Sequence, residues 1–140
     1  MSEFVTAAVD LCVASGVGTL YGRPAERDNT VVSVQDGYRR DFDPEPAVVA
    51  VFRGGGGAGL PFDTSEDYGM QVLVDATTVS GARAVSRQIY NLLHNRLAQV
   101  VGGFSVLWLR GVAPPQDLGP GPSDSERFTV TANYTARLLR

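Results

Sequence analysis

The chain has 140 residues, with 15 acidic and 12 basic side chains and a net charge of −3. This balance gives no electrostatic reason to expect nucleic acid as the main partner. One cysteine and one histidine cannot supply the four ligands of a structural zinc site, and one cysteine cannot form an internal disulfide. No apolar run approaches the ~20 residues that span a membrane, and the N-terminus lacks the basic leader of a signal peptide. The length suits one compact domain over residues 1–140.

Residues 2–15 predict a first helix. Phe4, Ala8, Leu11 and Cys12 recur at i, i+4, i+7 and i+8, which places them in one apolar stripe. Two glycines follow the segment closely and favour a helix end there. On this stripe the cysteine is expected to be a small core residue and not a reactive thiol.

Residues 17–46 predict an extended arm with one or two edge strands, because short apolar runs alternate with charged, turn-rich segments. Within the arm, Tyr38, Arg39, Arg40 and Phe42 combine aromatic rings with guanidinium groups, a composition that protein interfaces favour. A solvated loop of mixed charge explains the same residues equally well. These four residues are therefore candidates for a subunit interface.

The remaining residues, 47–139, form the predicted core. Apolar or alternating runs predict strands at 47–53, 70–77, 104–110 and 127–139, and an apolar stripe predicts a helix at 80–100. The predicted architecture is an α+β domain. It has a mostly antiparallel four-stranded sheet, two helices packed on one face, and the extended N-terminal arm.

Two long connections interrupt the predicted strands. Residues 54–69 begin with four glycines and end in acidic residues, and they predict a loose hairpin connection. Residues 111–126 contain four prolines and three glycines, which predict a surface loop without ladder pairing. Loops of this length are uncommon unless they have a function, so both are candidates for docking on partners.

The first and third predicted strands are apolar on both faces. Val49 and Val51 face away from their neighbours in the first strand, as Leu107 and Leu109 do in the third. A sheet covered on one face only should carry polar residues on the other. These four residues predict that the second face is partly covered, either by the arm or by another copy of the protein. They are candidates for a subunit interface.

The glycine run resembles a nucleotide-binding loop in its spacing. Gly54, Gly56 and Gly59 match G-x-G-x-x-G, and Asp75 follows at about the distance of a ribose-binding acid. Such a site needs a helix that begins at the loop and directs free N–H groups at the phosphates. No amphipathic helix fits between the glycines and the next strand, and the chain has no lysine for a P-loop. The sequence therefore predicts no cofactor.

Catalytic arrangements are also poorly supported. His94, the only imidazole, lies late in the predicted second helix. Asp63, Glu66 and Asp67 could form a carboxylate cluster, but a glycine-rich loop lacks the rigid placement that acid–base catalysis needs. We expect a solvated acidic loop there, no metal site and no enzymatic activity.

Three segments in this order, 70–93, 104–119 and 126–138, resemble the tail terminator (tail completion, or minor tail) proteins of long-tailed bacteriophages. The similarity lies in order and spacing and covers residues 47–139. An insertion, PGPSDSE, displaces the acidic residue that usually follows the Leu-Gly turn. The matching features are Gly69-Met70-Gln71-Val72, Ile89-Tyr90, Leu92-Leu93, Gly111 with Pro114, Leu118-Gly119, Arg127, and Asn133-Tyr134.

The resemblance implies a structural role in the virion. Such proteins form a hexameric ring that caps the tail tube, stops its polymerisation and faces the head–tail connector, while DNA passes through the lumen. It implies contacts with further copies of the chain, the major tail tube protein and the connector or stopper protein, no membrane, and assembly in the bacterial host cytoplasm. The alternatives are an adaptor or stopper of the same neck, a cap of a contractile tail or injection device, and a small-ligand-binding enzyme.

If the resemblance holds, the two long loops would dock on the tube or the connector. Arg83, Arg87 and Arg96 would pair with acidic residues of a partner or point to solvent. The partner-binding candidates are Arg53, Gly54, Gly57, Phe62, Asp63, Glu66, Asp67, Tyr68, Pro115, Asp117, Leu118 and Arg127.

Overall fold

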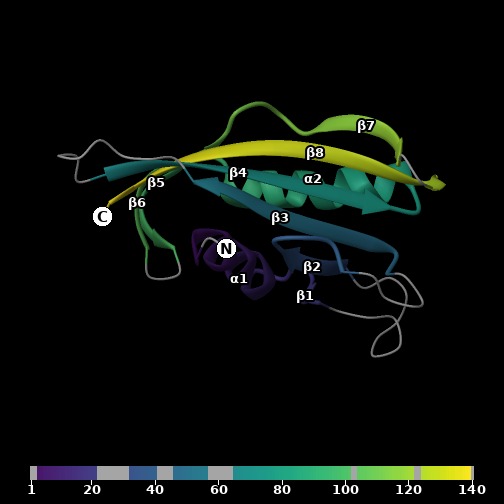
Figure 1. Ribbon diagram of the computed structural model, residues 1–140, viewed down its shortest axis with the longest axis horizontal. Helices are drawn as coiled ribbons and strands as arrows, with labels where there is room; N and C mark the ends of the chain where they lie inside the picture. The colour runs from purple at the N-terminus through teal and green to yellow at the C-terminus, as the bar shows by residue number, and fades with distance from the viewer. Residues whose placement is uncertain are drawn as a thin grey trace.

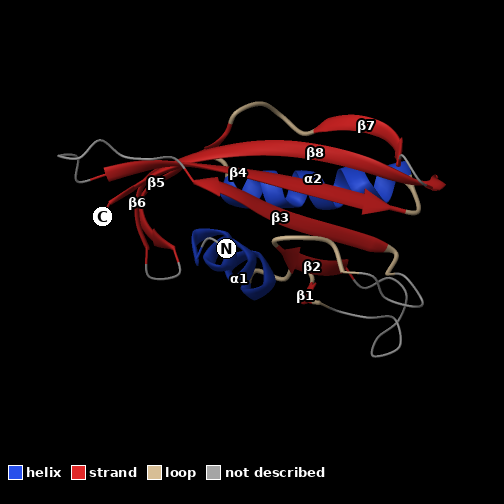
Figure 2. Ribbon diagram, viewed as in Figure 1, coloured by secondary structure: helices blue, strands red, loops and turns tan. Residues whose placement is uncertain are grey.

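The computed structural model describes residues 3–21, 32–40, 46–56, 65–101, 104–121 and 124–139. In these residues, two helices pack on one mixed sheet of eight strands (Figures 1 and 2). The helices are α1 (Glu3–Ala14) and α2 (Val79–Leu93). The strands are β1 (Thr19–Leu20), β2 (Val32–Asp36), β3 (Val48–Gly56), β4 (Ser65–Ala76), β5 (Arg96–Val101), β6 (Phe104–Gly111), β7 (Gln116–Gly121) and β8 (Asp124–Leu139).

The sheet is larger than predicted, and the expectation of a four-stranded, mostly antiparallel sheet is wrong. Seven strands form the path β1-β2-β3-β4-β8-β6-β5, and β7 pairs with β8 beside it. β1, β2 and β3 run parallel to one another, whereas the remaining pairs are antiparallel. The sheet also curls, so that β5 reaches α1 (Figure 1). The additional strands come from segments that the sequence predicts as arm, helix and loop.

The predicted arm contributes two parallel strands of the sheet. β2 ends at Asp36, which lies beside Phe52 in the middle of β3, so the chain must return along the sheet before β3 begins. Residues 37–40 start this return across the face that bears Val49 and Val51. Both valines are buried and lie outside the main core cluster. The chain's own arm therefore contributes to covering the second face.

Helix α2 is shorter than the predicted helix at 80–100. Its N-terminus is capped by Thr78, whose side chain accepts a hydrogen bond of 3.0 Å from the Gly81 amide. The helix ends at Leu93, and Asn95 adopts a left-handed conformation with φ of 61°. Asparagine tolerates this conformation better than most residues. The chain then reverses into β5, which pairs with β6.

The predicted loop at 111–126 also contains a strand. β7 pairs with the N-terminal half of β8, while β6 pairs with its C-terminal half. β7 has no second neighbour in the described part of the sheet, so Pro120 can sit there without breaking a ladder on both sides. Register shifts within the β7–β8 pairing accompany the glycines and proline. The prediction from proline content that this segment makes no ladder pairing is therefore wrong, because β7 is an edge strand.

A β-bulge changes which side chains of β6 face the core. Val106 lies opposite Leu138 and Trp108 opposite Arg137, so β6 has one extra residue between them. As a result, Val106 and Leu109 are both buried in the core, and Leu107 is exposed. The expectation that Leu107 and Leu109 share the second face is wrong, because simple alternation does not hold across a bulge.

The core lies between the sheet and the two helices, which cover the same face. Alternate residues of β3, β4 and β8 point into it, including Phe52, Val72 and Tyr134. α2 contributes the stripe that ends in Ile89 and Leu93. Each such side chain contributes about 1.5–3 kcal/mol when it is fully buried. This core fixes the sheet as a rigid platform for the outer surfaces.

Cys12 lies in this core, as the sequence predicts, and its thiol is free. Burial raises its pKa from 9.0 to about 12, and Arg96 opposes the shift. At pH 8, we expect a chromogenic disulfide reagent to modify the unfolded chain at once and the native protein only as fast as it opens. Rapid stoichiometric modification of native protein would contradict this burial.

The same shift gives a pH dependence of stability. Above pH 9 the unfolded thiol ionises, while the folded thiol stays protonated to about pH 12. The folded state therefore binds more protons in this range, and stability must fall as pH rises through it. Cys12→Ser offers the comparison, because the hydroxyl does not ionise there and the alkaline loss of stability should be smaller in the variant.

Candidate partner-binding surfaces

A groove between α2 and β7 gathers residues that are far apart in the sequence. This α2–β7 groove has a volume of about 480 Å³. The sequence names four of its residues as candidate partner contacts, and the pairing of β7 with β8 brings them together. The lining residues are Arg83 and Arg87 of α2, Pro115, Gln116 and Asp117 of the β7 segment, and Val130 of β8.

The groove carries more positive than negative charge. Arg83 donates from Nε to the two carboxylate oxygens of Asp117 at 3.0 and 3.3 Å. These hydrogen bonds lower the pKa of Asp117 and raise that of the Arg83 guanidinium. Arg87 lies 5.5 Å from the centre of the Tyr90 ring and has no carboxylate partner in the described residues. The described lining of the groove therefore holds two guanidinium groups and one carboxylate.

Three large apolar side chains are exposed on β6, on β7 and in the segment that joins these strands. Leu107, Val112 and Leu118 are 39%, 66% and 58% exposed. Leu118 directly follows Asp117 of the groove. Exposed large apolar side chains of this kind are candidates for contact with a partner.

The second face of β3, β4 and β8 carries a shallow polar trough with a volume of about 440 Å³. On β4, Gly69 lies two residues from Gln71, which lines the trough. The Asp67–Arg137 ion pair lies two residues beyond Gly69, with an Nε–Oδ1 distance of 2.8 Å. The trough is open because glycine has no side chain there. Its polar row consists of Arg53, Gln71 and Asn133, which lie opposite one another on three strands.

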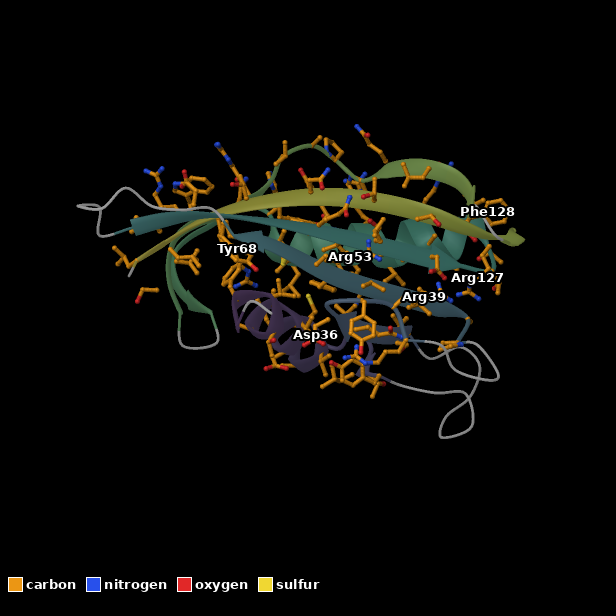
Figure 3. All side chains as sticks on the ribbon, in the orientation of Figure 1. Asp36, Arg39, Arg53, Tyr68, Arg127 and Phe128 are labelled. Atoms are coloured by element: carbon orange, nitrogen blue, oxygen red, sulfur yellow. The ribbon has the colours of Figure 1, made fainter. Side chains whose placement is uncertain are left out.

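Three charged residues fasten the return of the arm to the sheet. Asp75 of β4 accepts a hydrogen bond of 2.7 Å from Arg127 Nε and pairs with Arg39 through its other oxygen. Arg127 also donates from Nη2 to the carbonyl of Pro46 at 3.1 Å. Figure 3 shows Arg39 and Arg127 close together near one end of the molecule. Asp75, which the glycine spacing suggests as a ribose ligand, is thus held by the chain's own cations.

Arg40 joins the arm to the end of β2. Its guanidinium lies 4.0 Å from the centre of the Tyr21 ring and 4.8 Å from that of Tyr38. Its backbone amide donates to the Oε1 of buried Gln35 at 2.6 Å. Burial and a hydrogen bond to buried Asp36 raise the pKa of the Tyr21 hydroxyl. Arg40 therefore has a role within the subunit. Among the described interface candidates of the arm, Tyr38 is the one with a largely exposed ring.

Several predicted contact residues lie inside the molecule. Tyr68 is buried beneath Gly54, with its ring 5.3 Å from that of Phe4. Arg127 is nearly buried in its network with Asp75. These positions serve packing within the subunit. Phe42, Gly57, Phe62 and Asp63 lie outside the described residues, as does the side chain of Glu66.

His94 has a structural position at the end of α2. Its Nδ1 accepts a hydrogen bond of 3.0 Å from the Gly111 amide, and its ring stacks on Tyr90 at 4.7 Å. Within the described residues, no group of three or more His, Cys, Asp or Glu side chains could hold a metal ion. No helix in that part of the chain is long and apolar enough to cross a membrane. The histidine thus links α2 to β6.

Comparison with known proteins adds a fold but no function. No protein-family model and no curated protein matches the chain. One solved structure aligns over 100% of this chain and 96% of its own, with 18% sequence identity and a TM-score of 0.53. At that identity the likeness shows the fold alone. A distant protein of similar length therefore shares this overall fold.

Proposed function

We propose that this protein is a structural virion protein that forms a ring at the end of a phage tail tube, stops tube polymerisation and joins the tube to the head connector. The observation that carries the proposal is the presence of two separate concave surfaces on one sheet. The α2–β7 groove lies beside α2, and the polar trough lies on the opposite face of the sheet. A closed ring needs two different surfaces on each subunit, because its contacts are heterologous.

The segments that resemble tail terminators also build these surfaces. Residues 70–93 include most of β4 and all of α2, residues 104–119 include β6 and part of β7, and residues 126–138 lie in β8. β4 pairs with β8 along the whole length of β4, and these two strands carry the trough together with β3, while α2, β7 and β8 enclose the groove. The resemblance and the exposed surfaces therefore coincide in one contiguous part of the molecule.

The test is to add the purified chain to tubes growing from the cognate tail tube protein. We expect rings in solution or on tubes by electron microscopy, a ring at one end of each tube, and an end to tube growth. Light scattering gives the mass of the free protein. A chain that stays monomeric and leaves tube length unchanged would overturn the proposal. A ring that binds the connector and ignores tube ends would identify a neck adaptor or stopper instead.

A further inference from the structure

We propose that the α2–β7 groove of one subunit receives the acidic end of the β3–β4 hairpin of a second copy of this chain. The inference rests on the proposed ring and names the surfaces through which it closes. The charge of the groove, the charge of the hairpin and their separation along the sheet favour this pairing.

The groove has room and charge for one more carboxylate. Arg83 and Arg87 are four residues apart on α2, so their side chains are neighbours on the helix surface. Among the described residues that line the groove, Asp117 is the one acidic side chain, and it accepts hydrogen bonds from Arg83. Half-buried Pro115 supplies apolar surface, which docking would shield from water. Shielding strengthens an ion pair at Arg87 because it lowers the local dielectric constant.

The sequence of the hairpin carries three carboxylates close together. Asp63, Glu66 and Asp67 fall within five residues at the start of β4. Asp67 is exposed and is bonded by Arg137 on the neighbouring strand, which lowers its pKa. The sequence therefore provides two further acidic side chains, at positions 63 and 66, for a partner's guanidinium groups.

The two surfaces are too far apart to meet within one subunit. Ser65 lies opposite Leu139 at one end of β8, whereas Gln116 lies opposite Thr131. The intervening eight residues of a strand span about 26 Å. Figure 1 shows β7 toward the end of the molecule opposite the start of β4. A hairpin that fills a groove must therefore belong to another copy, and a contact between unlike surfaces is the kind that closes a ring.

The experiment reverses the charge of Arg87 in the full-length chain. We expect Arg87→Glu to weaken self-association at least about tenfold, because close charge pairs at interfaces couple by more than ~1.4 kcal/mol. Sedimentation over a concentration series at low salt measures the association. Arg87→Gln removes the charge without reversing it and should give a smaller loss. Circular dichroism checks that this exposed helix position leaves the fold intact.

Arg110→Glu is the matched control. Arg110 is exposed on β6, over the Trp108 ring, and does not line the groove. It makes the same change in net charge, so we expect association close to that of the wild type. Equal weakening by both reversals would indicate a general charge effect and would overturn the assignment of the groove.

A charge swap identifies the occupant. Combining Arg87→Glu with Asp63→Arg and Glu66→Arg should restore most of the lost association, because each groove again faces opposite charge. Recovery supports the proposal, whereas unchanged association in Arg87→Glu or no recovery in the swap overturns it. Rings of Arg87→Glu that form normally but no longer cap tubes would assign the groove to the tube protein, and the proposed function would stand. A wild-type chain that never assembles, alone or on tubes, would remove the proposed function itself.

Discussion

Replacing Asp75 with asparagine should lower the free energy of unfolding by about 3 kcal/mol, the lower end of the range for breaking a buried ion pair. The carboxylate is 17% exposed and neutralises Arg127, which is 11% exposed, as well as Arg39. Asparagine keeps the shape but removes the negative charge that Asp75 places between the two guanidinium groups. Urea denaturation gives the free energy, and the melting temperature should fall by roughly 10 °C.

Asp117→Asn provides the comparison, because it removes a carboxylate from an exposed pair with Arg83. Exposed pairs contribute little, so no measurable change in stability is expected there. If Asp75→Asn is as harmless as Asp117→Asn, the network at Asp75 does not hold the arm. A local effect on the arm alone would appear as faster proteolysis before residue 46 with unchanged global unfolding.

This network shows why the arm was hard to predict. Arg39 and Asp75 are 36 residues apart, and Asp75 and Arg127 are 52 apart, so no local pattern connects them. The apolar character of Val49 and Val51 did indicate a covered second face. The choice between the arm and another copy depended on β2 pairing parallel to β3, which only the folded chain shows.

The sequence predicted those elements whose residues carry a strong local pattern. The stripe of α2, its start near Thr78 and the antiparallel pairing of β3 with β4 follow from sequence spacing. β5 was missed because Leu97 continues the spacing of Ile89 and Leu93, so a helical pattern runs on past the helix. The signal for the true end was Asn95, a residue type that accepts the left-handed conformation found there.

The sequence predicted individual residues of the candidate surfaces but not which of them lie together in the fold. Charge and loop composition selected Arg83, Arg87 and Asp117. The groove exists because β7 pairs with β8 and places Asp117 against α2. The proline content predicted that this segment does not pair. Proline is compatible with a strand at the edge of a sheet, so a correct prediction required knowing where β7 lies in the sheet. The exposure of Leu107 likewise depends on a bulge that alternation cannot reveal.

Gly54→Ala should destabilise the fold by roughly 1–3 kcal/mol, the usual range for overpacking a core. The first glycine of the run lies in β3 opposite Met70, and its missing side chain leaves space that other atoms fill. A methyl group there would overlap the Tyr68 hydroxyl and Val5 Cγ2, and would lie 2.9 Å from Tyr68 Cζ. Denaturant unfolding measures this loss of stability. Where alanine fits without overlap, the same substitution is expected to stabilise a protein by about 0.4–1 kcal/mol.

Gly69→Ala separates packing from backbone effects, because Gly69 is an exposed glycine of the facing strand β4. Alanine there should be neutral or slightly stabilising. Tyr68→Phe should recover part of the loss in Gly54→Ala, since it removes one overlapping atom, and it should be mild alone because the described residues offer that buried hydroxyl no hydrogen-bond partner. Equal losses at both glycines would show that a backbone requirement shared by the two strands, and not contact with α1 and Tyr68, selects glycine at position 54. With the expected pattern, the glycine run has two roles: its first residue closes the core, and the rest lead into the hairpin proposed to reach the next subunit.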